Sequence, residues 1–196
     1  MSGRRRTNMV LEVVKYGHPV LRKKGAKIEK LTPDVRKLIS DMLETMRVAH
    51  GVGLAAQQIG EAVQLTVIDV SPVTDRPSTL EQNGKPADVN GFMPLVLINP
   101  EIKPYGEMQT GPEGCLSFPE IFADISRPSH VEVKALNENG EIIEFRAGGL
   151  LSRAIQHEVD HLNGILFIDR MSRDAKAEVQ AEIAELQAKT KTALKG

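Results

Sequence analysis

The sequence GLLSRAIQHEVDHLN, at residues 149–163, decides the fold of this chain. At about 100° per residue, its apolar positions form two stripes on nearly opposite faces of a helix. One stripe holds Leu150 and Ala154 together with His157 and His161, and the other holds Leu151, Ile155, Val159 and Leu162. Only a narrow strip is polar, made of Ser152, Arg153, Gln156 and Asp160. A helix that is apolar on two sides is typical of one buried between other elements.

Two histidines of this helix, His157 and His161, lie four residues apart and therefore one turn apart on one face. This spacing lets both imidazoles reach one metal ion, and Glu158 can contact a water on that ion. The histidines share their stripe with Leu150 and Ala154. We therefore expect an apolar pocket beside the metal.

A catalytic metal site usually needs a third protein ligand besides a water. A histidine six residues after His161 would indicate one class of peptidase, but Phe167 stands there. A thermolysin-like site would take a glutamate from the last predicted helix, and the candidates are Glu178, Glu182 and Glu185. The other candidate is Cys115, the one cysteine, because a thiolate is a strong ligand for borderline metals.

Outside this helix, the pattern predicts strands at residues 64–70, 95–98, 131–136 and 142–145, with a hairpin turn at 137–140. An earlier helix begins with Thr32 as its cap and Pro33 in its first turn, and it ends before Gly51. Strands that do not alternate with helices favour an α+β fold. We predict strands packed around a central buried helix that carries HEVDH.

Two further segments flank this core. Residues 71–93 are polar and rich in turn signals, which predicts a long surface loop, a mobile hairpin or an insertion. Residues 174–196 begin with apolar residues at helical spacing, which predicts a C-terminal amphipathic helix.

The composition suits one domain of a chain of 196 residues, of which 41% are apolar. The formal net charge of −1 gives no reason to expect a nucleic acid or an anionic membrane as partner. No apolar run is long enough to span a bilayer, and a lone thiol fits a reducing, cytoplasmic setting. Residues 1–8 are basic, and we expect a disordered extension before a single domain at 9–196.

Three stretches resemble, in order, the three motifs of the peptide deformylases: GVGLAAQQ at 51–58, EGCLS at 113–117 and QHEVDH at 156–161. The sequence YGHPVLR at 16–22 is similar to the start of that family. The resemblance covers about residues 9–190. It implies a hydrolase that removes the formyl group from the N-terminal formyl-methionine of nascent polypeptides and releases formate.

The resemblance also implies the roles of individual residues. Cys115, His157 and His161 would bind one divalent metal ion, with water or hydroxide in the fourth position. Fe²⁺ is expected, and Zn²⁺, Ni²⁺ or Co²⁺ can substitute. Glu158 would act as general base and then general acid during attack by the metal-bound hydroxide. The side chain of Gln58 and the backbone N–H of Leu116 would stabilise the oxyanion.

For the substrate, the resemblance implies backbone pairing with Val52, Gly53 and Gly114. It implies a methionine pocket that includes Val52, Leu150 and Ala154. One departure is Phe122, near which many bacterial members have an arginine, so contacts beyond the methionine are not carried over.

The partners implied are N-formylmethionyl nascent peptides in a cytoplasm of bacterial type, with neither a membrane nor a sequence-specific nucleic acid. The last helix ends in lysines and either docks on the ribosome or covers the domain's own core. Two rival interpretations are a thermolysin-like peptidase and a non-catalytic module that binds the ribosome.

Overall fold

The computed structural model describes residues 8–196. The extension predicted for residues 1–8 lies outside the described residues, except for Asn8, whose Oδ1 accepts a hydrogen bond from Ser40 at 2.7 Å. The main elements are α1 (Pro33–Val48), β1 (Gly53–Ala55), β2 (Leu65–Ile68), β3 (Ser78–Gln82), β4 (Lys85–Ala87), β5 (Leu95–Cys115), β6 (Phe118–Leu136), β7 (Ile142–Gly148), α2 (Gly149–Leu162), α3 (Arg173–Glu178) and α4 (Gln180–Ala193). Short 3-10 turns occur at Pro19–Arg22, Ala56–Ile59, Asn90–Phe92 and Phe167–Asp169.

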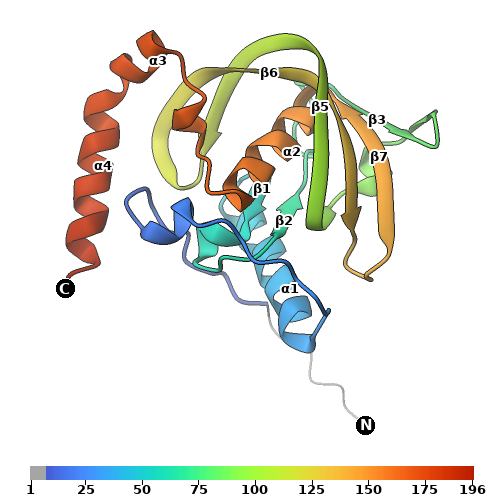
Figure 1. Cartoon of the computed structure of the whole chain (residues 1–196), viewed down its shortest axis with the longest axis horizontal. Coiled ribbons are helices and arrows are strands. Elements are labelled where there is room, and N and C mark those ends of the chain that lie inside the picture. The colour runs from blue at the N-terminus through green and yellow to red at the C-terminus, as the bar shows by residue number, and fades with distance from the viewer. Residues whose placement is uncertain (1–7) are drawn as a thin grey trace.

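The named strands form one antiparallel sheet in the order β1-β2-β5-β6-β7-β3-β4. An antiparallel sheet with a few helices confirms the α+β class. The sheet curves around α2, which contacts β1, β2, β3, β5, β6 and β7 (Figure 1). Because so many strands meet one helix, side chains on α2 can be joined by residues from distant parts of the chain.

The largest difference from the sequence prediction is the length of β5 and β6. The predicted strands at 95–98 and 131–136 are only the outer ends of a long hairpin. The segment between them contains glycines and prolines, which are uncommon inside strands. In the structure, Pro104 and Pro112 lie on β5 beyond the residues that pair with β2, where no second strand of the described chain pairs with the other edge of β5. A proline is tolerated at such an edge, since no ladder hydrogen bond needs its nitrogen.

Residues 71–93 contain a short hairpin of β3 and β4. Its turn is Asn83-Gly84, and both residues have positive φ, 53° and 71°. β3 pairs with β7, so this segment adds two strands to one end of the sheet. The segment is therefore part of the sheet rather than only a loop outside it.

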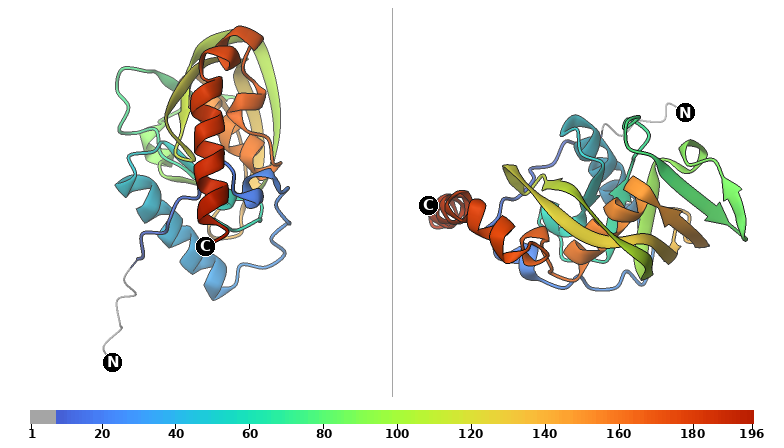
Figure 2. Two further views of the ribbon diagram at one scale, coloured as in Figure 1. Left: turned by 90° about the vertical axis from the view of Figure 1, so that its left-hand side faces the viewer. Right: turned by 90° about the horizontal axis from the view of Figure 1, so that it is seen from above.

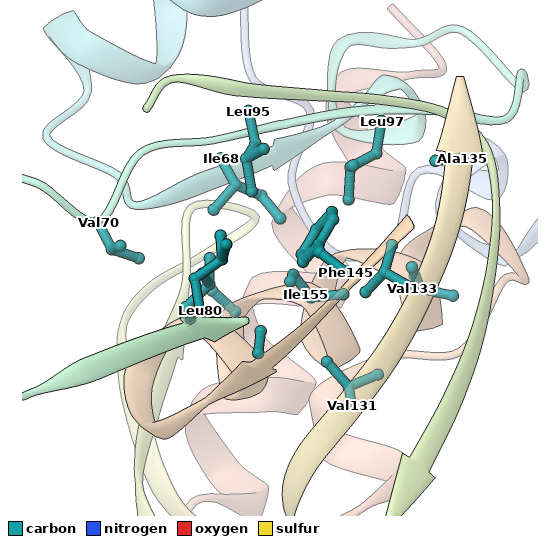
Figure 3. Close-up of a cluster of buried hydrophobic side chains, with 14 of the residues drawn as sticks. Ile68, Val70, Leu80, Leu95, Leu97, Val131, Val133, Ala135, Phe145 and Ile155 are labelled. Atoms are coloured by element: carbon teal, nitrogen blue, oxygen red, sulfur yellow. The ribbon is translucent and has the colours of Figure 1, made fainter. Parts of the chain in front are cut away.

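The core beneath the sheet joins α2 to alternate residues of the strands. Figure 3 shows Ile155 of α2 among Ile68, Leu95, Leu97, Val133 and Phe145. Leu151, Ile155 and Leu162 are each 0% exposed. Burying each such side chain stabilises the fold by about 1.5–3 kcal/mol relative to exposure.

The helices at the two ends of the chain pack differently. The Thr32 hydroxyl accepts a hydrogen bond from the Val35 N–H at 3.3 Å, as the predicted cap requires. Met42 and Met46 are buried residues of α1. The predicted C-terminal helix is present in two parts, because the helix that begins at Arg173 is interrupted at Val179 and continues as α4. α4 lies along the edge of the molecule (Figure 2), and Ile183 is its one buried residue. None of the described helices is both long and apolar enough to cross a membrane.

Candidate metal centre

The candidate metal centre lies where the end of β5 meets α2. His157 and His161 project from α2 with ring centroids 5.1 Å apart, as their helical spacing requires. Cys115 is the last residue of β5, and its Sγ lies 3.3 Å from His161 Nε2. One potential ligand atom from each of these three residues lies within 4.8 Å of the other two. A thiolate and two imidazoles are ligands that borderline divalent metals prefer.

The alternative third ligands do not lie in this centre. Phe167 is buried, and its ring packs edge-on against Phe118 at 5.0 Å. The glutamates of the C-terminal helices, Glu178, Glu182 and Glu185, are exposed. Within residues 8–196, Cys115 with the two histidines is the one group that could hold a metal. The thermolysin-like arrangement is therefore not found.

A buried carboxylate, Glu113, orients His157. Glu113 Oε2 lies 2.9 Å from His157 Nδ1, which leaves Nε2 of that ring free for a metal. Burial alone would raise the pKa of Glu113, but hydrogen bonds from His157 and Arg127 outweigh it and hold this pKa well below its usual range. A carboxylate that fixes a ligating imidazole is a common feature of metal sites.

Glu113 is the first residue of the EGCLS motif, but the sequence alone indicated no role for it. A local signal did exist. In a strand, residues two apart point to the same face, so Glu113 points to the same side as Cys115. If the strand had been predicted to extend to Cys115, the alternation of its side chains would have placed Glu113 on the same face as that cysteine.

Arg127 of β6 completes a buried network of charges. It donates to Glu113 at 2.6 and 3.0 Å and to Asp160 at 2.8 Å. Arg170 donates to the other side of Asp160 at 2.7 Å, and Arg153 donates to Glu113 at 2.9 Å. No local pattern indicated Arg127, because its partners lie 14 and 33 residues away.

The polar strip predicted on α2 thus faces protein and not solvent. Ser152, Gln156 and Asp160 are at most 8% exposed. Gln156 Nε2 donates to the Pro128 carbonyl at 2.9 Å and to Ser152 Oγ at 3.0 Å. Asp160, the last residue of this strip, is not solvated. It is bonded to Arg127 and Arg170.

Glu158 lies beside the two histidines and is buried. Among the described residues, its Oε2 has no hydrogen-bond partner, and neither has His161 Nδ1. Burial raises the pKa of Glu158 to about 7, although His157 opposes this shift. A carboxyl with such a pKa can both accept and donate a proton near neutral pH.

Gly53 explains how Glu158 fits at the end of β1. A Cβ added at Gly53 would lie 2.7 Å from Glu158 Cδ, closer than side-chain atoms normally approach. The carboxyl group therefore occupies the space that any larger residue would need. Glycine at this position is required by Glu158 itself.

The two adjacent glutamines have different positions. Gln58 Oε1 accepts from the Ala55 N–H at 2.9 Å, and its Nε2 faces Cys115 Sγ and Ser117 Oγ, both at 3.4 Å. Gln57 is fully buried, and its Nε2 points instead to the carbonyl of Leu162 at 3.3 Å. Of the two, only Gln58 offers an N–H donor at the candidate metal centre.

A cavity of about 520 Å³ opens beside this centre. It is lined by most of the predicted site residues, namely Val52, Gly53, Gln58, Gly114, Cys115, Leu116, Leu150, His157 and Glu158. It is also lined by residues that sequence reasoning did not assign, among them Lys15, Arg76, Phe122 and Arg153.

Ala154 is not among the lining residues and belongs to the buried cluster under the sheet. The face of α2 that borders the cavity carries Leu150, Arg153, His157 and Glu158. The helix is therefore turned slightly from the orientation that the apolar stripe had indicated.

Comparison with known proteins identifies the family of this chain. A family model described as polypeptide deformylase matches residues 10–177. The peptide deformylase of Methylacidiphilum infernorum is 46% identical over 179 residues, 91% of this chain and 94% of that protein. The peptide deformylase of Opitutus terrae is 44% identical over 189 residues, 95% of this chain and 98% of that protein.

Solved structures of peptide deformylases are also similar. Peptide deformylase 1B of Arabidopsis thaliana aligns with a TM-score of 0.80 at 34% identity, covering 93% of each chain. The enzyme of Synechococcus elongatus aligns with a TM-score of 0.73 at 36% identity, covering 97% of this chain and 91% of that one. Since the family model and these relatives span nearly the whole sequence, the chain belongs to the peptide deformylase family and is a hydrolase of protein processing.

Proposed function

We propose that this enzyme removes the formyl group from N-terminal formyl-methionine of nascent polypeptides and releases formate. One observation carries the proposal. Ligand atoms of Cys115, His157 and His161 lie within 4.8 Å of one another, and Cys115, His157, Glu158 and Gln58 border one cavity. These groups can hold a metal, move a proton and stabilise an oxyanion, which are the three tasks of formamide hydrolysis.

Cys115, His157 and His161 would hold the divalent ion. Their fit is supported by the bond between His157 Nδ1 and Glu113, which directs the opposite nitrogen of that ring to the ligand position. When bound, the ion acts as a Lewis acid that lowers the pKa of a bound water. We expect Fe²⁺ as the native ion, with Zn²⁺, Ni²⁺ or Co²⁺ able to substitute, because the donor set suits each of them.

Glu158 would take the proton of the attacking water and pass it to the leaving amine. Its Oε2 is buried and has no partner among the described residues, so it is available for this transfer. A pKa of about 7 suits both directions of the transfer. Positioned proton transfer contributes about 10²–10⁴-fold to the rate.

Two N–H donors would stabilise the oxyanion that forms on the formyl group. They are Gln58 Nε2, which faces Cys115 Sγ at 3.4 Å, and the backbone N–H of Leu116, next to that cysteine. The bond from Ala55 N–H to Gln58 Oε1 fixes which end of the amide points into the site. One donor of this kind contributes roughly 10²–10³ in rate.

The peptide substrate would lie as an added strand along Val52, Gly53 and Gly114, which border the cavity. Val52 and Leu150 would contact the methionine side chain. Ala154, predicted for the same pocket, stands behind Leu150 in the buried cluster. In this proposal Ala154 does not contact the methionine side chain and shapes the pocket only through its neighbours.

The test is formate release from a formyl-Met peptide by protein loaded with Fe²⁺ without air. The same peptide carrying an acetyl group serves as the substrate control. Glu158→Gln should keep the metal and lose about 10²–10⁴ in kcat, whereas Cys115→Ala should lose the metal itself. Absence of formate release by the iron-loaded wild type would refute the proposal. Turnover by a metal-bearing Cys115→Ala protein would favour the peptidase alternative.

The substrate places the enzyme in the cytoplasm, where nascent chains emerge from ribosomes. Lys189 and Lys191 lie near the end of α4 and Lys195 lies just beyond it; all three are exposed and could contact ribosomal RNA. This contact is tested by pelleting with ribosomes before and after deletion of residues 174–196. Equal pelleting of both proteins would leave α4 with only a packing role.

A further inference from the structure

Residues 14–16, near the start of the chain, form hydrogen bonds with the hairpin tip that follows Cys115. β5 ends at Cys115 and β6 begins at Phe118, so Leu116 and Ser117 form the two-residue tip between them. Most of the long hairpin is held by its own ladder of hydrogen bonds. The carbonyls of the tip lie outside that ladder and need other donors.

Three hydrogen bonds join residues 14–16 to the tip and to Gln58. The Tyr16 N–H donates to the Ser117 carbonyl at 2.9 Å, and the Val14 N–H donates to the Gln58 carbonyl at 2.8 Å. Between them, Lys15 Nζ donates to the Leu116 carbonyl at 2.9 Å. One extended tripeptide therefore connects both residues that would supply the oxyanion donors.

Two further contacts fix the same tip. The rings of Tyr16 and Phe118 stack with centroids 4.8 Å apart. A Cβ added at Gly51 would lie 2.8 Å from Leu116 Cδ1, so the leucine side chain packs directly on the Gly51 backbone. Both contacts restrain the tip or the residue next to it.

Lys15 is the one side chain among the three hydrogen-bond donors, and it is half-buried in the wall of the cavity. It borders the cavity together with Gln58, Cys115 and Leu116. A bond from a charged donor to a backbone carbonyl is stronger than a neutral one. Lys15 therefore restrains the backbone of Leu116, the residue whose own N–H is the second proposed oxyanion donor.

We propose that Lys15 is a positioning residue. By bonding to the Leu116 carbonyl, it restrains the backbone of Leu116 and thereby fixes the position of the Leu116 N–H relative to the side-chain amide of Gln58. This inference rests on the proposed deformylase function. It concerns a residue outside the three motifs and is independent of which metal is bound.

The experiment compares wild type with Lys15→Met, Lys15→Gln and Lys15→Arg. Lys27→Met is the matched control, since Lys27 is an exposed lysine of the same N-terminal segment. Two quantities are measured at equal metal content. The first is amide hydrogen exchange of a peptide covering residues 113–119, with and without metal. The second is the pair kcat and KM for formate release.

Misplacement of a reacting group by about 1 Å can cost about 10²-fold in rate. We expect Lys15→Met to exchange faster at the tip and to lose about 10–100-fold in kcat, with KM nearly unchanged. Lys15→Gln should show the same effects to a smaller degree, because it keeps a polar end but cannot span the distance. Lys15→Arg should restore both quantities toward wild type, and Lys27→Met should change neither.

Unchanged exchange and kcat in Lys15→Met would overturn the proposal. A rise in KM with unchanged kcat would also overturn it, because Lys15 would then bind substrate. If Lys15→Met does not fold, wild-type exchange and kcat in Lys15→Gln would overturn the proposal in its place. Inactive wild-type protein would refute the deformylase function, while the exchange measurement would still test how Lys15 holds the tip.

Discussion

The buried guanidinium of Arg127 offers the sharpest test of how the site is supported. Its side chain is 5% exposed, and its partners Glu113 and Asp160 are 5% and 11% exposed. Arg127→Met keeps an unbranched apolar stem but removes the guanidinium and with it three hydrogen bonds to carboxylates. Both carboxylates then remain buried with fewer donors.

Removing one partner of a buried ion pair typically costs about 3–5 kcal/mol. Arg153 still donates to Glu113 and Arg170 to Asp160, so the lower end of this range applies. A loss of about 3 kcal/mol lowers Tm by roughly 6–12 °C in a chain of this size. Since Glu113 orients His157, metal affinity should also fall by about 10–100-fold.

Thermal unfolding of the metal-free protein measures the loss of stability, and metal titration of the folded protein measures the loss of metal affinity. The matched control is Arg146→Met, because Arg146 pairs with Glu132 at 2.8 Å on the exposed face of the same sheet. Exposed pairs contribute little to stability, so this variant should unfold near the wild-type temperature. If Arg127→Met shifted Tm no further than Arg146→Met, the buried network would not support the site as argued.

Three other predictions concern individual contacts. Gly53→Ala should fold but displace the Glu158 carboxyl, and its kcat should fall at least about tenfold, as a displaced reacting group implies; wild-type kcat would contradict the packing. Burial alone would raise the pKa of Asp41, but bonds from Lys37 and a backbone N–H hold it below the usual range. The stability that this pair contributes is present above the unfolded pKa and is lost as pH falls through the lower, folded pKa. In urea unfolding, the difference in stability between wild type and Asp41→Asn should therefore be largest at neutral pH and should shrink as the pH is lowered below the usual range of a carboxyl. Exposure to air should inactivate iron-loaded protein, because the metal and Cys115 can both oxidise; equal activity with and without air would argue against iron.

The fold was predictable where the pattern is local. The α1 helix with its Thr32 cap, the outer parts of β5, β6 and β7, and α2 all follow from periodicity and turn residues. The middle of the long hairpin was not predictable in this way, because Pro104 and Pro112 normally argue against a strand. They are tolerated because, among the described residues, no second strand pairs with the other edge of β5 there. Which edge stays unpaired is decided only when the sheet assembles.

By itself, the sequence determined that His157 and His161 share one helix face, that Glu158 lies beside them, and that this helix is apolar on two sides. These are consequences of 3.6 residues per turn and need no other part of the chain. The motifs then added Cys115 and Gln58 by resemblance.

Only the tertiary structure decided which groups support them. Arg127 reaches Asp160 across 33 residues, and Lys15 reaches the Leu116 carbonyl across 101. Such pairs leave no periodic signal, since they depend on how the curved sheet places distant strands against α2. A side-chain charge buried without its partner would be costly, and burial of these charges became possible only when the fold brought each of them to a partner.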